Sequence, residues 1–525
     1  MRHAAPALHR YRRRLSLTAL SLALGLLLGA SPASAADDGA RYIVAFKAGK
    51  GHAGRQALTQ ARGLLRHEVQ GQDAVSADLP AAALKALQNN PHVDYIEEDV
   101  KRYPLGGSSA STGAPYALGQ QVPYGIKLVQ ADQLPDTYAA NRKLCIIDSG
   151  VAATHEDLAG NSMTGEYDSG TGWWYTDENH HGTHVAGTIA AVNNAGIGVV
   201  GVNANRQIKL HIVKVFGADA WAYSSTLATA ANKCAAAGAN VISMSLGGSR
   251  SNKTEQRAFD SLAAKGILSI AAAGNAGTTA LSYPAGYSSV VSVAAIDEAR
   301  LWASFSQYNS KVELAAPGVN VLSTVPPGAG SSSSLSVGSS VYAPGGMDGS
   351  PRLSASAPLA DFGLGGAVNT AMAGKICLIQ RGSYDFATKV LNCQNSGGVG
   401  AVVYNNLAGG YGGTLGTTVT SIPSVTASDT EGAQLKLQLG QAASLAVSAA
   451  NYAFYDGTSM ATPHVSAVAA LVWSYFPSCS AGQLRTSLNN SAEDLGAAGR
   501  DTKYGYGLVR AKAAYDRIKA LGCGK

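Results

Sequence analysis

The sequence has little charge, few cysteines and almost no long apolar run. Asp, Glu, Lys and Arg make up 14% of its 525 residues, a low share for a cytosolic protein. The six cysteines include no CxxC pair, which disfavours metal and thiol redox chemistry. One apolar run, at residues 15–30, stands out, and it is short for a membrane span. The remaining composition is globular, and the length suits two or three domains.

The N-terminal segment has the features of a secretory signal peptide. Basic residues precede the apolar run, and the small residues Ala33 and Ala35 follow it. We expect cleavage after Ala35 or Ala36 and a soluble product, extracellular or in transit through the periplasm. A retained membrane anchor is the alternative. The leader holds five Arg and no acidic residue, so without it the formal net charge falls from +6 to +1. No basic patch is then left for nucleic acid.

In an exported chain, six cysteines favour disulfide bonds. Cys377 and Cys393 lie close together in one compositional block, and we expect them to pair. Six cysteines allow fifteen pairings, so the partners of the others stay open; they are Cys145, Cys234, Cys479 and Cys523. The apolar surroundings of Cys145 in "KLCII" are also compatible with a buried free thiol.

Composition divides the chain into blocks. Residues 41–102 predict a small α+β unit, and a loop rich in Gly, Ser and Ala follows as an exposed linker. After it, apolar runs alternate with alanine-rich helical stretches, the pattern of a parallel sheet covered by helices. Residues 341–450 are rich in Gly, Val and Ser and predict a separate, mainly β domain inserted into this α/β pattern. The expected boundaries are 1–36, 37–104, 105–121, 122–334, 335–450 and 451–525.

Polar residues stand at the ends of three apolar runs in the α/β part. In a parallel sheet, such residues meet in a crevice at the carboxyl ends of the strands. The first run, "KLCIID", ends at Asp148. The second, "ANVISMSLGG", contains Ser245, and the third, "GILSIAAAGN", ends at Gly274 and Asn275. A single Asp after a strand is weak evidence, because many such residues cap the next helix.

Three histidines compete for a role in the stretch "HHGTHVAGTIAA", which predicts a helix from about Gly182. HExxH is absent and no acidic residue lies at helical spacing, which disfavours zinc. His184 lies one turn into the helix and is expected to be a buried structural residue. His181 lies at the helix edge, beside His180, and can reach outward.

The stretch "DGTSMATPHV" places Ser459 at the expected start of an apolar helix, because Pro463 is tolerated only in a first turn. Apolar residues then repeat at helical spacing: Val465, Val468, Ala469 and Val472. Unpaired backbone N–H groups and the helix dipole at this end suit a developing oxyanion. An ordinary helix-capping serine is the alternative for Ser459 alone. No GxSxG motif surrounds it, which disfavours an esterase.

Asp148, His181 and Ser459 occur in an order known for one class of hydrolases. Together with "IIDSGV", "HGTHVAGT", "AAAGN" and "GTSMATPHV", they make the chain closely resemble the subtilisin-like serine proteases, the subtilases of peptidase family S8. The resemblance implies a subtilisin-like parallel sheet flanked by helices. It implies a catalytic triad of these three residues and an oxyanion donor at Asn275.

The resemblance also implies the substrate cleft. A strand of the enzyme would pair with the extended substrate through Ser245, Leu246, Gly247 and Gly248. Gly274 would lie beside the primary pocket, and a small residue such as Ser282 would leave room there for bulky apolar side chains.

By the same resemblance, residues 41–102 correspond to an inhibitory prodomain, with "YIVAFK" and "YIEED" as matching pieces. The enzyme would remove this segment itself, at a bond between Tyr103 and Leu118. The inserted block resembles a protease-associated domain, which either restricts or recruits substrate or is a passive spacer.

A structural calcium ion is a further implication of the resemblance. The loop "VNNAGIGV" is similar to a calcium loop, and no catalytic cofactor is expected. The implied ligands are side chains or backbone carbonyls of Gln120, Asp157, Val192, Asn194, Ile197 and Val199. A turn that merely contains Asn and Gly is the alternative.

The sequence therefore predicts a secreted, monomeric serine endopeptidase, made as a zymogen that processes itself and acts on proteins or peptides. The alternative is an inactive protein that keeps the same fold and binds peptides. The variant Ser459→Ala, which lacks only the expected nucleophile, distinguishes the active protease from the inactive binding protein.

Overall fold

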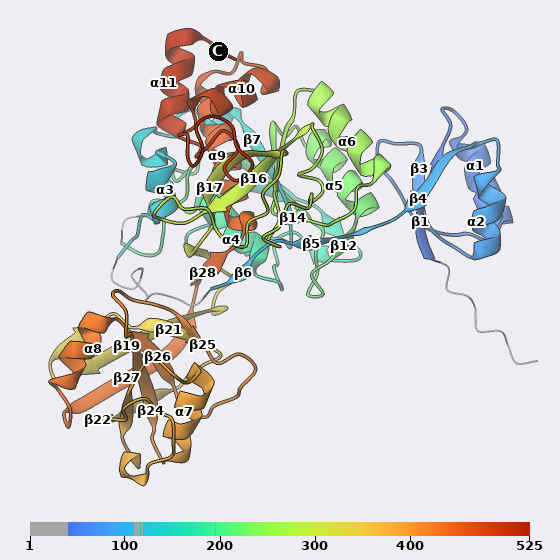
Figure 1. Cartoon of the computed structure of the whole chain (residues 1–525). Helices are drawn as coiled ribbons and strands as arrows, with labels where there is room; N and C mark the ends of the chain where they lie inside the picture. Colours follow the sequence, from blue (N-terminus) through green and yellow to red (C-terminus); the bar gives the residue numbers. More distant parts are fainter. Residues whose placement is uncertain (1–39, 110–115, 117–118, 195) are drawn as a thin grey trace, which may run out of the picture.

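The computed structural model describes residues 40–109, 116, 119–194 and 196–525, so the expected signal peptide lies outside the described residues. Three bodies are visible in Figure 1: a small N-terminal unit, a central α/β domain and a mainly β domain inserted into it. Among the described residues, no helix has both the length and the apolar character needed to cross a membrane.

The N-terminal unit is a four-stranded antiparallel sheet with two helices on one face. Val44 and Phe46 of its β1 strand face helices α1 and α2, while Ile43 and Ala45 face the other way and contact Ala228 and Ala258 of the central domain. Because successive side chains of a strand point to opposite faces, one face of β1 packs in the unit's own core and the other packs against the central domain. The elements are β1 (Ala40–Phe46), α1 (Gly51–Gln60), β2 (Leu64–Glu68), β3 (Ala74–Leu79), α2 (Ala81–Gln88) and β4 (Val93–Glu98).

The central domain is built on a parallel sheet of seven described strands in the order β17-β16-β15-β13-β7-β11-β8. Six of these strands are almost wholly buried, as expected of a parallel sheet covered on both faces. Their bounds are β7 (Lys143–Asp148), β8 (Ser162–Gly165), β11 (Lys209–Lys214), β13 (Val241–Met244), β15 (Leu268–Ala272), β16 (Val290–Ile296) and β17 (Val312–Pro317).

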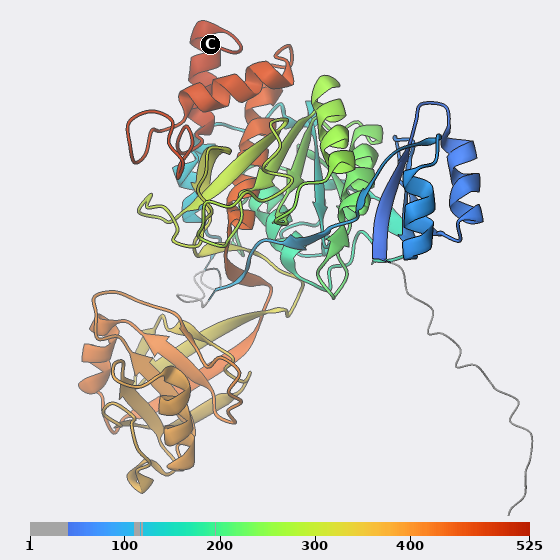
Figure 2. The same ribbon diagram turned by 45° about the vertical axis from the view of Figure 1, so that its right-hand side comes forward.

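Helices cover both faces of this sheet and create two cores. One core packs helices α4 and α9 against the sheet, and the other packs α5 and α6 against its opposite face. Figure 2 shows the N-terminal unit beside the second pair. The helices are α3 (Tyr124–Leu128), α4 (His181–Ala190), α5 (Ser224–Ala236), α6 (Lys253–Ala264), α9 (Thr458–Tyr475), α10 (Ala481–Ser491) and α11 (Ala511–Leu521).

The inserted domain folds around a nine-stranded sheet and two helices. Its first strand begins at Gly330, slightly before the expected boundary at residue 335, because Gly330 already pairs with Ala450. Its elements are β19 (Gly330–Val337), β20 (Ser340–Tyr342), β21 (Gly345–Asp348), β22 (Ser354–Asp361), β23 (Ile376–Gln380), α7 (Phe386–Asn395), β24 (Gly400–Tyr404), β25 (Gly413–Thr414), β26 (Ser424–Ala427), α8 (Asp429–Lys436) and β27 (Ala442–Ala450).

Short strands join the bodies. β18 (Val321–Thr324) leads into the inserted domain and pairs with β28 (Tyr452–Asp456), which leads out of it. β12 (Ala222–Tyr223) and β14 (Leu246–Gly247) belong to the central domain, whereas β5 (Lys101–Pro104) and β6 (Gly107–Ser108) follow the N-terminal unit.

A further hairpin pairs β9 (Tyr167–Asp168) with β10 (Gly172–Trp173).

The six cysteines form three disulfides, and each ties together elements of one domain. Cys377 in β23 bonds to Cys393 in α7 inside the inserted domain. The other two bonds lie in the central domain and join Cys145 to Cys234 and Cys479 to Cys523. Cys145 is therefore buried without being a free thiol.

The segment expected to be an exposed linker differs from that expectation where the structure describes it. Instead of a free loop, residues 101–109 cross the central domain as two short strands, visible in blue in Figures 1 and 2. β5 pairs with β12 and β14, and β6 pairs with β28. β5 supplies backbone partners to both β12 and β14, and β6 supplies them to the edge of β28, which composition alone does not reveal.

Candidate active site

Asp148 and His181 meet at the carboxyl end of the central sheet. Asp148 is the last residue of β7 and His181 is the first of α4, and His181 Nδ1 lies 2.8 Å from Asp148 Oδ1. Both side chains are almost fully buried. Burial disfavours the charged imidazole, but the Asp148 carboxylate outweighs it and raises the pKa of His181 above its ordinary value. His181 Nε2 is buried and has no hydrogen-bond partner among the described residues, so its capacity to accept a hydrogen bond is unused.

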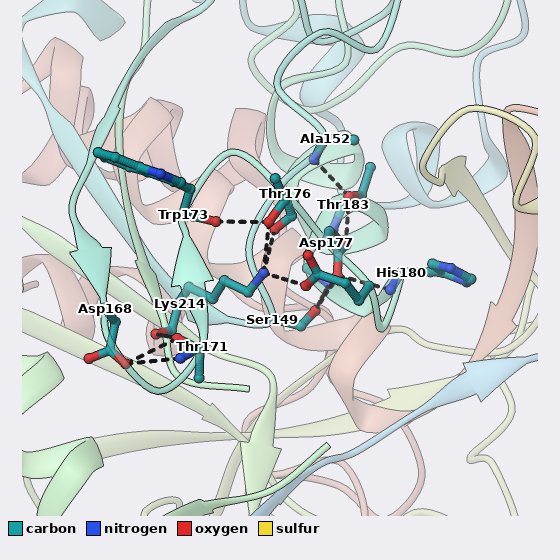
Figure 3. Close-up of polar contacts among 12 residues, drawn as sticks. Ser149, Ala152, Asp168, Thr171, Trp173, Thr176, Asp177, His180, Thr183 and Lys214 are labelled. Carbon is teal, nitrogen blue, oxygen red and sulfur yellow. Dashed lines mark hydrogen bonds and ion pairs between the residues drawn. The ribbon is translucent and has the colours of Figure 1, made fainter. Parts of the chain in front are cut away.

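A second buried carboxylate, Asp177, fixes this end of α4. It accepts hydrogen bonds from the backbone N–H groups of His180 and Thr183, each over 2.8 or 2.9 Å. Ser149 Oγ donates to Asp177 Oδ1 over 2.8 Å and accepts from the Gly182 N–H. Figure 3 shows these residues converging on Asp177, with the His180 ring turned away from the carboxylate. Because Ser149 follows Asp148, this network sets the Asp148 carboxylate and helix α4 relative to each other.

Ser459 lies in the first turn of α9, where its backbone N–H is free of the helix's own hydrogen bonds. Asn275 accepts from the Thr458 N–H and Thr458 Oγ1 through Oδ1, at 2.9 and 2.7 Å, which turns its amide NH₂ toward the cleft. Gly457 adopts φ 150°, and a Cβ there would meet the Leu105 oxygen at 2.5 Å. Glycine is thus required beside this small polar site.

The Ser459 hydroxyl makes no hydrogen bond to His181 Nε2. It donates instead to the Ser245 backbone oxygen over 2.8 Å. Rotation about the Cα–Cβ bond of Ser459 is therefore needed before His181 can take its proton. Hydrogen bonds between catalytic groups commonly form only in the reacting complex.

His184, in the same motif, has a structural role. His184 Nε2 lies 3.0 Å from the Val321 carbonyl oxygen, and its ring stacks on Tyr455. Burial lowers the pKa of His184 to about 3, as expected of a neutral core residue. Across the part of the chain that the structure describes, no group of three or more His, Cys, Asp or Glu is arranged to hold a metal ion.

A cleft runs beside Ser459, and the protein's own β5 strand lies in it. Tyr103 pairs with Gly247 of β14, and Arg102 pairs with Ala222 of β12. β5 is thus the middle strand of a three-stranded antiparallel sheet. Of the residues expected to bind substrate, Leu246 and Gly247 form β14, and Gly248 follows directly.

Leu105 continues this strand up to Ser459. Its N–H donates to the Ser245 oxygen over 3.1 Å, and its carbonyl oxygen accepts from the Ser459 N–H over 3.0 Å. The next residue, Gly106, packs against Ser459 so closely that a Cβ on Gly106 would lie 3.2 Å from Ser459 Cβ. The Leu105–Gly106 peptide bond therefore lies directly against the serine.

The side chain of Leu105 enters a pocket beside the cleft. This pocket is lined in part by Gly247, Asn275 and Ser282. A Cβ on Gly247 would meet Ser282 Oγ at 2.3 Å and Leu105 Cδ1 at 2.8 Å. Gly274 stands behind the pocket against Gln307, whose side chain also lines it. Small residues thus leave room for a medium-sized apolar side chain.

Most of the residues expected to bind calcium lie close together. Gln120 Nε2 donates to Val192 O and to Asn194 Oδ1, each over 3.0 Å. Asp157 accepts from Asn194 Nδ2 over 2.6 Å and from the Val199 N–H over 2.7 Å. Burial raises the pKa of the Asp157 carboxyl. The set comprises one carboxylate, two side-chain amides and a backbone carbonyl, which carry the oxygen types that calcium prefers, and Gln120 faces the others through its NH₂ group here.

Ile197 lies in the same loop, with 49% of its surface exposed. Its expected contribution to a calcium site is a backbone carbonyl, which leaves its side chain free to face solvent.

Sequence reasoning missed three residues of this region: Asp177, Leu105 and Glu255. Asp177 lies four residues before His181, a spacing that by itself carries no chemical signal. Leu105 lies in a Gly-rich stretch that reads as a loop. Glu255 lies in the first turn of α6. Only the three-dimensional structure shows that it pairs with Arg102 of β5.

The chain is similar in sequence to known protein families and to individual proteins. The sequence profile of the subtilase family matches residues 140–361 and 411–507, and that of the PA domain matches residues 338–435. An alkaline protease of Alkalihalobacillus alcalophilus is 36% identical over 268 residues, 50% of this chain and 64% of the relative. Subtilisin DY of Bacillus licheniformis is 42% identical over 214 residues, 39% of this chain and 76% of the relative.

Among solved structures, the psychrophilic subtilisin-like protease of Pseudoalteromonas sp. AS-11 superimposes with a TM-score of 0.64 and 42% identity. The match covers 77% of this chain and 99% of that one. Family profile, relatives and fold agree on the same α/β core, and the chain therefore belongs to the subtilase family and carries an inserted PA domain.

Proposed function

We propose that this protein is a serine endopeptidase that hydrolyses peptide bonds through Ser459, His181 and Asp148. Ser459 Oγ attacks the carbonyl carbon, and His181 Nε2 takes its proton and passes it to the leaving amine. Asp148 orients the imidazole and stabilises its charged form. The Ser459 N–H and the Asn275 amide hold the oxyanion. Support comes from family membership and from the 2.8 Å contact of His181 with Asp148.

The observation that carries this proposal is the protein's own chain in the cleft. Residues 101–105 pair with β12 and β14 as an extended substrate would, by strand addition. The Leu105 carbonyl oxygen accepts from the Ser459 N–H, one of the two proposed oxyanion donors. The N-terminal unit is then an inhibitory prodomain, and the Leu105–Gly106 bond, within the expected range of 103–118, is the one that the enzyme cuts in its own chain.

A fluorophosphonate probe, which reacts with activated serines, tests the proposed function. We expect the processed protein to be labelled on the peptide that contains Ser459 and to degrade unfolded casein. Ser459→Ala should do neither. A processed wild-type protein that binds casein peptides but takes up no probe would support the inactive peptide-binding alternative.

Export of the protein belongs to the same proposal. The three disulfides support it, because such bonds persist in oxidising compartments outside the cytosol. The protein would act there as a monomer on protein or peptide substrates, with its N-terminal unit as an intramolecular inhibitor.

Calcium would be held by the Asp157 cluster as a structural ion and would stabilise the loop between α4 and β11. Its charge would compensate the buried Asp157 carboxylate. We expect EDTA to lower the Tm of the processed protein by about 5–10 °C, the shift that saturating ligand release gives in a domain of this size. In Asp157→Asn the Tm should start lower and EDTA should add almost nothing. A wild-type Tm that EDTA leaves unmoved would remove calcium from the account.

The inserted domain would contribute to substrate binding beyond the cleaved bond. Support comes from a cavity of about 190 Å³ between the two domains. Ser108 and Ser109, which follow the proposed scissile bond, line it together with Ser333 and Asp348 of the inserted domain. A substrate's third and fourth residues after the bond would therefore face that domain.

Filling this cavity tests the role of the inserted domain. We expect Ser333→Trp to lower kcat/KM about threefold to tenfold, the loss of one or two contacts, for peptides that extend four residues beyond the bond. Peptides that end before the cavity should be cleaved as by wild type. Val419→Trp is the control, because Val419 lies in the same domain, is 88% exposed and does not line the cavity. Equal losses on both peptide lengths would indicate a passive spacer.

A further inference from the structure

The side chain of Arg102 occupies a pocket built around a buried carboxylate. Its Nε donates to Glu255 Oε1 over 2.9 Å and its Nη2 to Glu255 Oε2 over 2.6 Å. The two side chains are 1% and 0% exposed. Nη2 also donates to the Arg250 backbone oxygen over 3.0 Å. This paired geometry suits a planar guanidinium and cannot be reproduced by a lysine ammonium or an apolar side chain.

Residues of the central domain hold Glu255 in place without help from Arg102. Glu255 lies in the first turn of α6, and its N–H donates to the capping side chain of Asn252 over 3.0 Å. The Tyr287 hydroxyl lies 2.7 Å from Glu255 Oε2 and accepts from the Asn252 N–H over 2.8 Å. Burial and the neighbouring Glu255 raise the pKa of Tyr287, which keeps its hydroxyl protonated. The carboxylate is thus positioned before an arginine arrives.

The strand register relates this pocket to the reaction. Leu105 precedes the proposed scissile bond, so Arg102 is the fourth residue before it. A substrate that pairs with β12 and β14 in the same register directs its own fourth residue toward Glu255, because side chains alternate along the strand.

We propose that the processed enzyme selects substrates with arginine four residues before the scissile bond, and that Glu255 is the residue that selects it. This inference rests on the proposed protease function. An apolar side chain in the pocket would leave the buried carboxylate without a positively charged partner, with only the Tyr287 hydroxyl among the described residues as a donor to it, which is strongly unfavourable. The pocket therefore rejects apolar residues as well as favouring arginine.

Short fluorogenic peptides test the pocket on protein whose N-terminal unit has been removed, by the protein itself or by an added protease. Each is Xaa-Tyr-Pro-Leu joined to aminomethylcoumarin, with Arg, Lys or Leu as the first residue and active sites counted by fluorophosphonate titration. We expect kcat/KM to be about 10- to 100-fold higher for Arg than for Leu, the effect of hydrogen bonds to a charged group, with Lys in between. Equal rates for the three peptides would overturn the proposal.

Variants at Glu255 separate selection from a purely structural role. Glu255→Gln, of the same size, should reduce the preference for Arg over Leu to about threefold or less. Glu255→Leu should invert the order, a result that general loss of structure cannot produce. Glu298→Gln, an exposed carboxylate outside the pocket, should keep the wild-type preference. An Arg preference that survives in both Glu255 variants would also overturn the proposal.

The product peptides Arg-Tyr-Pro-Leu and Leu-Tyr-Pro-Leu, titrated by calorimetry into the same sample, separate the two claims. Tighter binding of the Arg peptide without any hydrolysis would contradict the protease function and uphold the pocket. Hydrolysis without regard to the first residue would contradict the pocket and uphold the protease function.

Discussion

Ser459→Ala is expected to lower kcat by about 10⁶-fold, the magnitude known for loss of the nucleophile in subtilisin. Only the hydroxyl is removed, and among the described residues it makes one side-chain hydrogen bond, to the buried Ser245 oxygen, whose acceptor keeps the Leu105 N–H as a second donor. The variant should therefore fold and should accumulate as the uncut precursor. Residual turnover of a peptide substrate is measured after an added protease has removed the N-terminal unit and wild-type contamination has been excluded.

Ser466→Ala is the matched control, because this serine lies two turns further along α9 and donates only to the Thr462 backbone oxygen. It should process itself and turn over substrate as wild type does. If Ser459→Ala cleaved its own chain at a normal rate, Ser459 would not be the nucleophile.

Asp148→Asn is expected to lower kcat by about 10⁴-fold, as the equivalent change does in a serine protease of another fold. The amide keeps the size of the carboxylate but can donate a hydrogen bond to His181 Nδ1, which favours the wrong tautomer of the ring. The KM for short peptides should change little, since Asp148 lies behind His181 and away from the cleft. A loss that appeared in KM alone would contradict the assigned role.

The pH profile of the same variant gives an independent readout. His181 acts as a base in its neutral form, so the rate falls as the pH falls through its pKa. In wild type, burial lowers this pKa and the Asp148 carboxylate raises it, with a net rise. Removal of the Asp148 charge leaves only the smaller effect of Asp177 to oppose burial, so the acid limb of kcat should move to lower pH in Asp148→Asn. A shift to higher pH would contradict this account.

Much of the α/β domain and the core of the site could be predicted from the sequence, because both are encoded locally. Asp148 ends a buried strand, Asn275 follows one, and Ser459 lies at the start of an apolar helix. Each reactive group therefore lies at the end of an element that the sequence pattern predicts. Parallel strands then bring these groups to one edge without any further information.

The rest of the site depends on contacts between distant segments. Asp177 and Ser149 act through hydrogen bonds that only the folded chain defines. Glu255 reads as an ordinary first-turn helix residue, and its bond to Arg102 spans 153 positions. Residues 104–109 have the composition of a loop, and their strand conformation is imposed by the edges of β14 and β28.

The most direct test of the account is the N-terminal sequence and intact mass of the secreted protein. For wild type, we predict a chain that begins at Gly106, while Ser459→Ala retains the residues before it. This result would show that Ser459 cuts the bond that lies against it. If both chains were cut at the same bond, or if wild type began elsewhere than Gly106, the proposed self-cleavage and the substrate register derived from it would be wrong.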